Sequence, residues 1–342
     1  MKPAITQAPP DCPVCTGGSS SEVSEVFDDR YGHPGEFRLV RCDQCGHLMT
    51  SPRLSESDLP ALYGTYYPRK RITAESVTAQ AVGVASWITR WKRWLSGTDN
   101  QGQYGVLAGE RMLDIGCGSG VSLLEAQSLG AQAWGVEADP NVQAIARALG
   151  LRIHEGNLHD KPFPEVQFDL VVMNQVIEHI PQPDLALTAV HERLAPGGRV
   201  VLVFPNIGSV WCKLAGARWI NWHVPYHLHH FSLKTFTLLA QRCGYKVVCS
   251  RTVTPNLWSI LQVRASSQSP VRGHPTPLWT TSVHGGADAG MQVGEAAPRA
   301  RKAARRLLLS SIMVPVMLVN RLVDVLGWGD SLVVELVPLG SV

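Results

Sequence analysis

Short apolar runs alternate with amphipathic segments through the middle of this 342-residue chain. The runs are rich in Val, Ile, Leu and Phe and four to nine residues long, which favours buried strands, while the segments between them carry helical spacing and end at glycines such as Gly130 and Gly150. This alternation predicts an α/β domain around a parallel sheet. We expect its strands over residues 112–115, 133–136, 151–154, 168–173, 199–204, 245–253 and 331–338.

The first of these strands runs directly into three glycines at alternate positions, in the sequence Asp114-Ile-Gly-Cys-Gly-Ser-Gly120. Glycine suits a turn that a ligand must approach closely, and the helix that follows offers free N–H groups. Glu137 ends the next strand, 21 positions after Gly116, where a carboxylate can hold ribose hydroxyls. Because the third glycine comes one position too early for a pyrophosphate loop, the pattern indicates a nucleoside ligand other than a dinucleotide.

The Asp114–Gly120 loop resembles the first motif of the class I S-adenosylmethionine-dependent methyltransferases. The resemblance continues in the same order through 168–180, Leu194-Ala-Pro-Gly-Gly198 and Val203-Phe-Pro-Asn206. It implies a Rossmann-like, seven-stranded sheet whose last strand, 331–338, returns antiparallel. It also implies S-adenosylmethionine as the cofactor. A degenerate domain of this fold without a cofactor is the alternative.

The same resemblance implies a set of cofactor-binding residues. Backbone groups of the glycine loop hold the methionine part, Glu137 holds the ribose, and the Asn157-Leu158 region lies at the adenine. Asn157 stands where the family has an aspartate, but an amide oxygen can still accept from the adenine amino group, and Asp160 is a substitute. The full set is Asp114, Gly116, Cys117, Gly118, Gly120, Glu137, Asn157, Leu158 and Asn174.

Two C-x-x-C pairs near the N-terminus, Cys12/Cys15 and Cys42/Cys45, indicate a structural Cys₄ zinc site. The segment between them has few apolar residues, so zinc would contribute to its folding. Redox pairs or incidental cysteines are the alternatives. A similar cysteine ribbon precedes the methyltransferase domain in some bacterial enzymes that methylate sugars and other small metabolites. In those enzymes a tyrosine-rich connector, here 62–67, packs near the cofactor or substrate; interdomain packing is the alternative.

Histidines gather after the fifth strand, where Pro225-Tyr-His-Leu-His-His-Phe231 resembles a segment of the same family. A histidine has a pKa close to neutral and can act as general base toward a hydroxyl. We take His227 as the first candidate and His230 as the second, with a purely structural role as the alternative for each.

Glu178-His179 resembles part of a metal-binding Glu-x-x-Glu-His arrangement in ubiquinone-type O-methyltransferases. Gln175 replaces the first glutamate of that arrangement, which removes an anionic ligand. We therefore favour Glu178 and His179 as a positioning pair, a general base or supporting structure over a catalytic metal site.

Two segments have an amphipathic pattern, and the sequence does not decide whether their apolar sides face the protein or a membrane. A helix over 76–95 carries Trp87, Trp91 and Trp94 among basic residues. It has three alternative places: packed on the core, covering the active site, or lying on a membrane surface. Five bases within 299–306 precede an uncharged stretch of 13 residues, 307–319, which is too short to span a bilayer. That stretch is either buried or drawn to anionic lipid.

Composition narrows the function further. A net charge of +3 and a charged fraction of 17% do not indicate a dedicated nucleic-acid enzyme, and the polar, proline-rich start lacks a secretory leader. We expect a cytoplasmic protein, with peripheral membrane contact through 299–326 left open; the oligomeric state is not legible. The expected organisation is a zinc ribbon (1–60), a helical connector (61–105), a methyltransferase core (106–265 and 327–342), a flexible linker (266–300) and a basic-apolar helix (301–326).

The sequence thus predicts an S-adenosylmethionine-dependent methyltransferase that acts on an oxygen or carbon of a small metabolite, such as a sugar or a lipid-linked intermediate. Two other classes stay open. One is a non-catalytic protein that binds the cofactor or serves in assembly. The other is an RNA-modifying enzyme that grips its substrate through the ribbon and the bases of 299–306.

Overall fold

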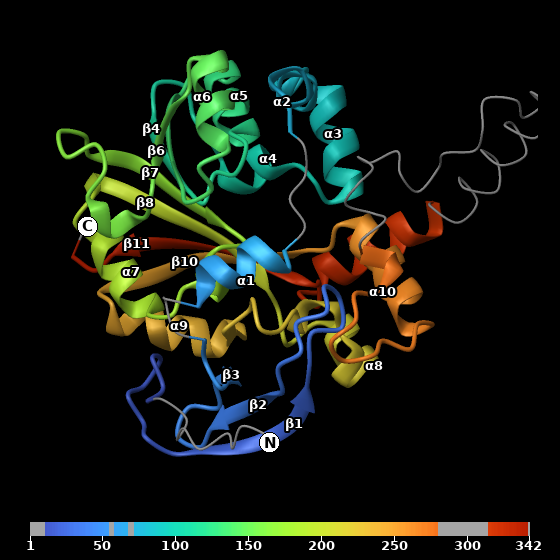
Figure 1. The fold of residues 1–342 in the computed structure, drawn as a ribbon. Coiled ribbons are helices and arrows are strands. Elements are labelled where there is room, and N and C mark those ends of the chain that lie inside the picture. The colour runs from blue at the N-terminus through green and yellow to red at the C-terminus, as the bar shows by residue number, and fades with distance from the viewer. Residues whose placement is uncertain (1–10, 55–57, 68–71, 280–313, 341–342) are drawn as a thin grey trace, which may run out of the picture.

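The computed structural model describes residues 11–54, 58–67, 72–279 and 314–340. A seven-stranded sheet crosses the molecule, with the strand order β10-β11-β8-β7-β4-β5-β6 (Figure 1). Its strands are β4 Arg111–Ile115, β5 Gln132–Glu137, β6 Arg152–Glu155, β7 Phe168–Asn174, β8 Leu194–Pro205, β10 Tyr245–Val253 and β11 Ser331–Pro338.

Six of the seven strands lie close to where the hydrophobic pattern places them, and β8 begins five residues earlier than expected. Strands β6, β5, β4, β7 and β8 are parallel to their neighbours. Strand β11 is inserted between β8 and β10 and runs antiparallel to both. The α/β class, the seven strands and the antiparallel return of 331–338 are therefore confirmed.

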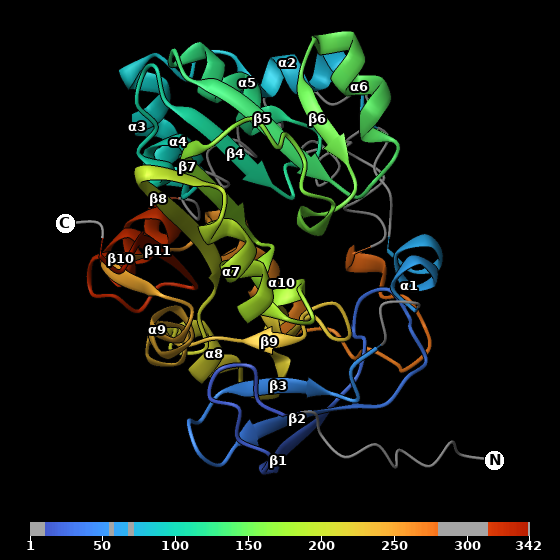
Figure 2. The ribbon, with the colours of Figure 1, turned by 90° about the vertical axis from the view of Figure 1, so that its left-hand side faces the viewer.

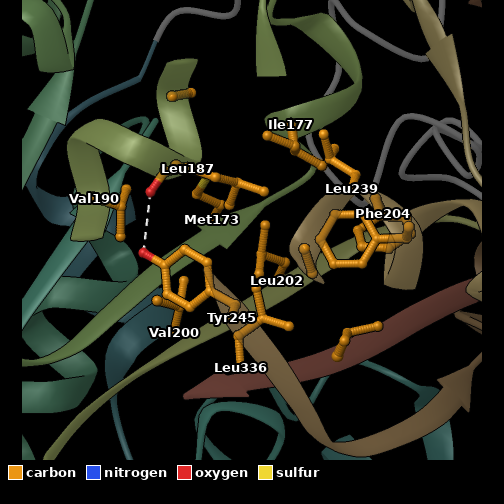
Figure 3. Close-up of a cluster of buried hydrophobic side chains, with 14 of the residues drawn as sticks. Met173, Ile177, Leu187, Val190, Val200, Leu202, Phe204, Leu239, Tyr245 and Leu336 are labelled. Atoms are coloured by element: carbon orange, nitrogen blue, oxygen red, sulfur yellow. Dashed lines mark hydrogen bonds between the residues drawn. The ribbon is translucent and has the colours of Figure 1, made fainter. Parts of the chain in front are cut away.

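Helices cover both faces of the sheet and enclose two apolar layers. On one face, Leu187 and Val190 of α7 meet Leu239 of α9 above the strands (Figure 3), and the Tyr245 hydroxyl donates to the Leu187 carbonyl at 3.0 Å. The helices here and on the opposite face are α4 Asn100–Tyr104, α5 Val121–Ser128, α6 Val142–Leu149, α7 Pro183–His191 and α9 Leu233–Arg242. Local signals set their ends: Pro183 opens α7, and Gly150 closes α6 at φ +64°.

The N-terminal module forms a second sheet, in the order β1-β2-β3-β9. Three strands come from the ribbon itself, β1 Ser20–Val26, β2 Phe37–Cys42 and β3 Leu48–Ser51. The fourth, β9 His229–His230, comes from the chain between β8 and β10 and pairs antiparallel with β3 (Figure 2). The ribbon is thus joined to the rest of the molecule by backbone pairing.

The helix expected over 76–95 is interrupted. The structure has α1 Leu59–Thr65, then α2 Ala74–Ala81 and α3 Trp87–Ser96, with Gly83 at φ +80° between the last two. A left-handed glycine cannot continue a right-handed helix, so the chain turns there. Helix α3 has no buried residue, which rules out core packing as the reason for its apolar stripe.

The first part of the expected flexible linker, 266–279, lies within the described residues. Helix α10 Asn256–Ser266 is followed by ordered chain in which Leu278 and Trp279 are buried, with the Arg30 guanidinium 4.1 Å from the centre of the Trp279 ring. Most of the predicted linker and the start of the basic-apolar helix fall in 280–313, outside the described residues. A helix is described over 314–325. No helix among the described parts of the chain is long and apolar enough to cross a membrane.

Candidate active site

The glycine loop follows β4 and has the conformation that its sequence predicts. Gly116, Gly118 and Gly120 all have positive φ, at +72°, +52° and +84°. A Cβ on Gly116 would lie 2.5 Å from Val176 Cγ2, and one on Gly120 would lie 2.6 Å from Leu151 Cδ1, so packing forbids a side chain at both. A Cβ on Gly118 would meet no atom within 4 Å. The middle of the loop therefore faces open space that a ligand can enter.

Glu137, at the end of β5, lies beside this loop. One carboxylate oxygen accepts from the Gly118 backbone N–H at 2.9 Å, and the other accepts from the Asp139 backbone N–H at the same distance. The carboxylate is half-buried and held in place from two sides. This is a place where a carboxylate can take up the hydroxyls of a ribose laid across the loop.

Asp114 supports the loop from inside. It is buried and accepts a hydrogen bond from the Ser122 hydroxyl, and burial raises its pKa to about 7. Asn174, also predicted at the site, donates its amide to the Tyr104 hydroxyl at 2.8 Å. Neither Ser122 nor Tyr104 was singled out from the sequence. A hydroxyl eight residues beyond Asp114 is a signal that could have identified Ser122.

Other predicted cofactor residues have local partners of their own. The Cys117 thiol is buried against Gly135, and its backbone N–H donates to the Val136 carbonyl at 3.2 Å. The Asn157 side-chain oxygen already accepts from the His159 N–H at 2.8 Å, and Leu158 is buried. Asp160, the suggested substitute, accepts from the Asn157 N–H. These contacts shape the loop after β6 and leave the adenine assignment a prediction.

On the acceptor side, Glu178 and His179 lie in the 3₁₀ turn η2 Ile177–His179, after β7, and His227 comes from the loop before β9. Their ligand atoms all lie within 4.8 Å of one another. The Nδ1 atom of His179 lies 2.9 Å from the Tyr226 carbonyl, and that of His227 lies 2.9 Å from the Asn221 carbonyl. Because a carbonyl can only accept, both rings carry the proton on Nδ1 and keep a lone pair on Nε2.

Glu178 is fully buried, and neither carboxyl oxygen has a hydrogen-bond partner among the described residues. Burial raises its pKa to about 8 and lowers the pKa of His179 to about 4. A buried polar group left without a partner is costly, which makes this carboxyl a candidate to bind a ligand. One carboxyl group and two imidazole lone pairs suit a substrate hydroxyl, and once the carboxyl is ionised they would also accept a divalent cation.

Backbone strain flanks this cluster. Gln175, just before it, has φ +57°, and His223, in the loop that carries His227, has φ +39°. Positive φ is unfavourable for residues with a Cβ and is often found where a site must be held in one geometry. The His223 Nδ1 atom lies 3.4 Å from His227 Nε2.

His230, the second candidate base, is placed differently. It lies on β9, and its Nε2 is 3.0 Å from the Thr50 hydroxyl of the ribbon. That hydroxyl donates to the His227 carbonyl at 2.7 Å, so Nε2 of His230 is the donor to Thr50. Its side chain thus connects the two sheets, and it is not in the Glu178, His179 and His227 cluster.

Aromatic rings from three separate segments surround the same region. Tyr63 and Tyr67 of the connector meet Tyr226, with ring centres 5.5 and 5.4 Å apart, and the Tyr63 hydroxyl is 3.2 Å from His179 Nδ1. Tyr31 of the ribbon lies 5.6 Å from Tyr226 and 5.7 Å from His223. The connector and the histidine loop are therefore brought together. Tyr31 was missed, because nothing near it in the sequence indicates a site.

The buried carboxylate Asp330 holds the histidine loop in place through hydrogen bonds. Its oxygens accept from the Ser209 hydroxyl at 3.1 Å, the Trp219 indole at 2.8 Å and the Asn221 amide at 2.8 Å. Burial raises its pKa to about 6. Since the Asn221 carbonyl accepts from His227, Asp330 acts on that histidine through one intervening residue.

The four ribbon cysteines come together as the C-x-x-C pairs predict. Their sulfurs all lie within 4.8 Å of one another, with Cys12 to Cys45 at 3.6 Å and Cys15 to Cys42 at 3.5 Å. A tetrahedral zinc with Zn–S bonds of about 2.3 Å separates its sulfurs by about 3.8 Å. The cluster therefore fits a zinc ion that could bind there.

Comparison with known proteins supports the same reading of the central part of the chain. A family model of the methyltransferase domain matches residues 87–250. The ubiquinone biosynthesis O-methyltransferase of Cereibacter sphaeroides is 36% identical over 132 residues, 36% of this chain and 53% of that protein. The protein of that name from Xanthomonas oryzae pv. oryzae is 31% identical over 134 residues, 36% of this chain and 56% of that protein.

The chain thus spans about half the length of these curated relatives. Among solved structures, an S-adenosylmethionine dependent methyltransferase from Mesorhizobium loti has 16% identity and a TM-score of 0.42, with 75% of this chain and 99% of that chain covered. The matched family model, the strand order and the glycine loop agree with one another. Residues 87–250, just under half of the chain, therefore match the model of a methyltransferase domain.

Proposed function

We propose that this protein transfers a methyl group from S-adenosylmethionine to an oxygen or carbon of a small metabolite. The observation that carries the proposal is the Glu137 carboxylate held against the Gly118 N–H, inside a matched methyltransferase domain. Beside it, Gly118 leaves open space for the cofactor. In this proposal the glycine loop holds the methionine part of the cofactor and Glu137 holds its ribose.

The cofactor supplies an electrophilic methyl on sulfur, and the chain's own residues supply alignment and a base. For a hydroxyl acceptor, the O–C bond forms as the S–C bond breaks, and the bond electrons stay on sulfur as a neutral thioether. The hydroxyl proton goes to Nε2 of His227 or His179, which carries the lone pair because Nδ1 donates to a carbonyl; at His227 the hydroxyl takes the place of His223 Nδ1, which is 3.4 Å from that atom. Alignment contributes most of the acceleration, and proton transfer about 10²-fold or more.

The acceptor enters, in this proposal, between the connector tyrosines and the histidine loop. Tyr63, Tyr67 and Tyr226 offer flat apolar faces with polar hydroxyls, and the unpartnered Glu178 carboxyl can bind a second hydroxyl of the acceptor. A ring with neighbouring hydroxyls, such as a sugar, or a polar head on a lipid tail suits these groups. Two relatives are named ubiquinone biosynthesis O-methyltransferases, which supports an oxygen acceptor. For a lipid-linked acceptor we also propose membrane contact through 299–326.

The first test is binding of S-adenosylmethionine and of its demethylated product to the zinc-loaded protein, followed by native mass spectrometry and calorimetry. We expect one nucleoside per chain. Transfer of labelled methyl to a panel of catechols, sugars and lipid-linked acceptors then identifies the substrate class. A folded, zinc-loaded protein that binds neither nucleoside overturns the proposal.

A matched pair of variants separates an enzyme from a protein that only binds the cofactor. His227→Ala should keep cofactor affinity and lose transfer by about 100-fold, the usual contribution of a general base. His191→Ala, at an exposed position on α7, should change neither. Equal transfer in both variants would remove the base role of His227, and labelled RNA as the only product would move the acceptor class to nucleic acid.

A further inference from the structure

Three surface helices of this protein expose apolar side chains to solvent. A helix at a protein surface normally buries its apolar side and exposes its polar side. In α3 and the helix over 314–325 most apolar side chains are exposed instead, and α10 exposes Leu257 and Val263 while its Trp258 and Leu261 pack against a small apolar cluster. Six of the exposed side chains are between 49% and 75% exposed, namely Trp87, Trp91, Trp94, Leu257, Leu318 and Leu322, which we call the outer face.

The inward sides of two of these helices are polar and hydrogen-bonded. Asn320 of helix 314–325 is buried and donates to the Asn256 side chain of α10 at 2.9 Å, and Ser259 donates to Asn320 at 3.0 Å. Gln262 of α10 is buried as well and accepts from the Ile220 N–H at 2.9 Å. A polar interior with satisfied partners holds these helices in place while their apolar sides stay outside.

The three helices lie side by side. Arg321 donates to the Trp94 carbonyl at 2.8 Å, which ties helix 314–325 to the end of α3. Asn256 donates to the Leu95 carbonyl at 3.0 Å, which ties α10 to the same end. In Figure 1 the red helix over 314–325 lies between α3 and α10. The outward side chains therefore belong to one region of the surface, larger than scattered single residues would make.

Acids near this region are paired with bases. Helix α3 carries Arg90, Lys92 and Arg93 and no acid of its own, and Arg90 pairs with Asp99 at 3.7 Å and Arg93 with Glu125. The acid within 314–325, Asp324, is turned inward, where it pairs with Arg321 at 2.8 Å and accepts from the Thr254 hydroxyl. In the sequence, five bases within 299–306 come shortly before the same helix. Tryptophan and leucine surrounded by bases without a free acid match the interface of an anionic bilayer.

We propose that the outer face docks this protein onto an anionic lipid surface, with Trp87 and Trp91 inserted at the headgroup level. The proposal concerns α3, α10 and the described helix over 314–325, and it does not depend on the methyl-transfer chemistry.

The test is flotation of the full chain with lipid vesicles. Vesicles contain phosphatidylglycerol and phosphatidylcholine at about one to two, and the comparison is phosphatidylcholine alone. We expect binding to the anionic vesicles, weakened about tenfold by the double change Trp87→Ser and Trp91→Ser and by added salt. Both positions are exposed, so the fold should not change. Leu185→Ser on α7, which is 49% exposed, is the matched control and should bind as the parent does.

Three results overturn the proposal: no flotation, flotation of the tryptophan variant equal to that of the parent, or a stable dimer by ultracentrifugation with no lipid binding. The last result assigns the outer face to a second copy of this chain. S-adenosylmethionine affinity is measured for the same proteins and should be equal in all of them. A failure of lipid binding is thereby kept separate from a failure of the proposed methyl transfer.

Discussion

The glycine loop and the histidine cluster are the two halves of the candidate active site, and they are built in different ways. The loop from Asp114 to Gly120 is one continuous segment, braced by Ser122 and by Glu137 at the end of the next strand. The cluster draws Tyr31 from the ribbon, Tyr63 from the connector, and Glu178 and His227 from two later segments. The first half depends on local backbone geometry, whereas the second depends on the ribbon, connector and core meeting correctly.

If the proposed function holds, this difference predicts that one half holds a fixed ligand while the other can vary. A glycine loop in which a Cβ would clash at two positions tolerates little change. A cluster of rings from separate segments can change through any one of them. Disturbing the ribbon should therefore damage acceptor chemistry while leaving cofactor binding intact, and the following experiments test that separation.

The largest effect is expected from loss of the ribbon metal. Cys42→Ser should abolish zinc binding and unfold the ribbon, because binding energies of structural zinc are of the order of 10 kcal/mol. Transfer should fall by at least about 100-fold through loss of the ribbon side of the acceptor pocket, while calorimetry should find the cofactor affinity within a few-fold. Cys249→Ser, at an exposed cysteine of β10, is the control. If cofactor binding disappears together with zinc, the glycine loop and the histidine cluster depend on one another, and the predicted separation is wrong.

The second largest effect is expected from acid, which should lower the stability of the region around the histidine cluster. Burial lowers the pKa of seven histidines, so the unfolded chain binds more protons than the fold below pH 6.5, and stability falls as pH falls through that range. Each such proton contributes about 1.4 kcal/mol per pH unit. The seven are His33, His47, His179, His223, His227, His229 and His230.

Three buried carboxyls act in the opposite direction. Their folded-state pKa values are raised, to about 7 for Asp114, about 8 for Glu178 and about 6 for Asp330, so lowering the pH through this range favours the fold. The histidines outnumber them, and the melting temperature should drop between pH 7 and pH 5. Hydrogen exchange at pH 5 should show the β3–β9 seam opening before β4 and β5. Equal protection of the β3–β9 seam and of β4 and β5 at pH 5 would argue against independent behaviour of the two halves of the site.

The cofactor half should respond to a change of one side chain in the loop. Gly118→Val adds atoms where no protein atom lies within 4 Å, so it should block the ligand with only about 1 kcal/mol of backbone strain. We expect cofactor affinity to fall about 100-fold by calorimetry, equivalent to about 2.7 kcal/mol. Gly150→Val has a similar φ of +64° and open surroundings at the end of α6, and it should bind normally. Equal losses in both variants would mean that strain, and not blocking, is responsible.

The smallest effect is expected from Asp330→Asn. This change replaces one acceptor oxygen with a donor and should release either Trp219 or Asn221, which loosens the carbonyl that orients His227. We expect kcat to fall about tenfold while the cofactor affinity stays the same, since positioning losses are moderate. A change in cofactor affinity alone, with kcat preserved, would contradict the positioning role.

The sequence predicted the parts of the molecule whose chemistry is local. The spacing from Gly116 to Glu137 anticipates a carboxylate beside the loop, and the two C-x-x-C pairs anticipate the sulfur cluster. Both work because short segments constrain their own geometry. The parallel strands were equally visible, since a strand buried on both faces must be apolar throughout.

What the sequence could not predict depends on partners that lie far along the chain. His230 meets Thr50, and Asp330 meets Asn221, across more than 100 positions in each case. The pattern of helix 314–325 left two alternatives, because its apolar side could be buried or could face lipid. The structure shows which side faces the protein, since Asn320 is buried. Gly83 was visible in the sequence, but a single glycine in a helical pattern is often tolerated.

The two-residue strand β9 has a consequence for how such a protein can diversify. Because β9 completes the ribbon sheet with residues next to His227, the N-terminal module is not an independent appendage. It brings Tyr31 into the acceptor wall and Thr50 under the histidine loop. Recombination that exchanged this module between related genes would therefore transplant part of the substrate specificity together with the zinc ribbon, and would succeed only where the incoming edge strand still matches His229 and His230.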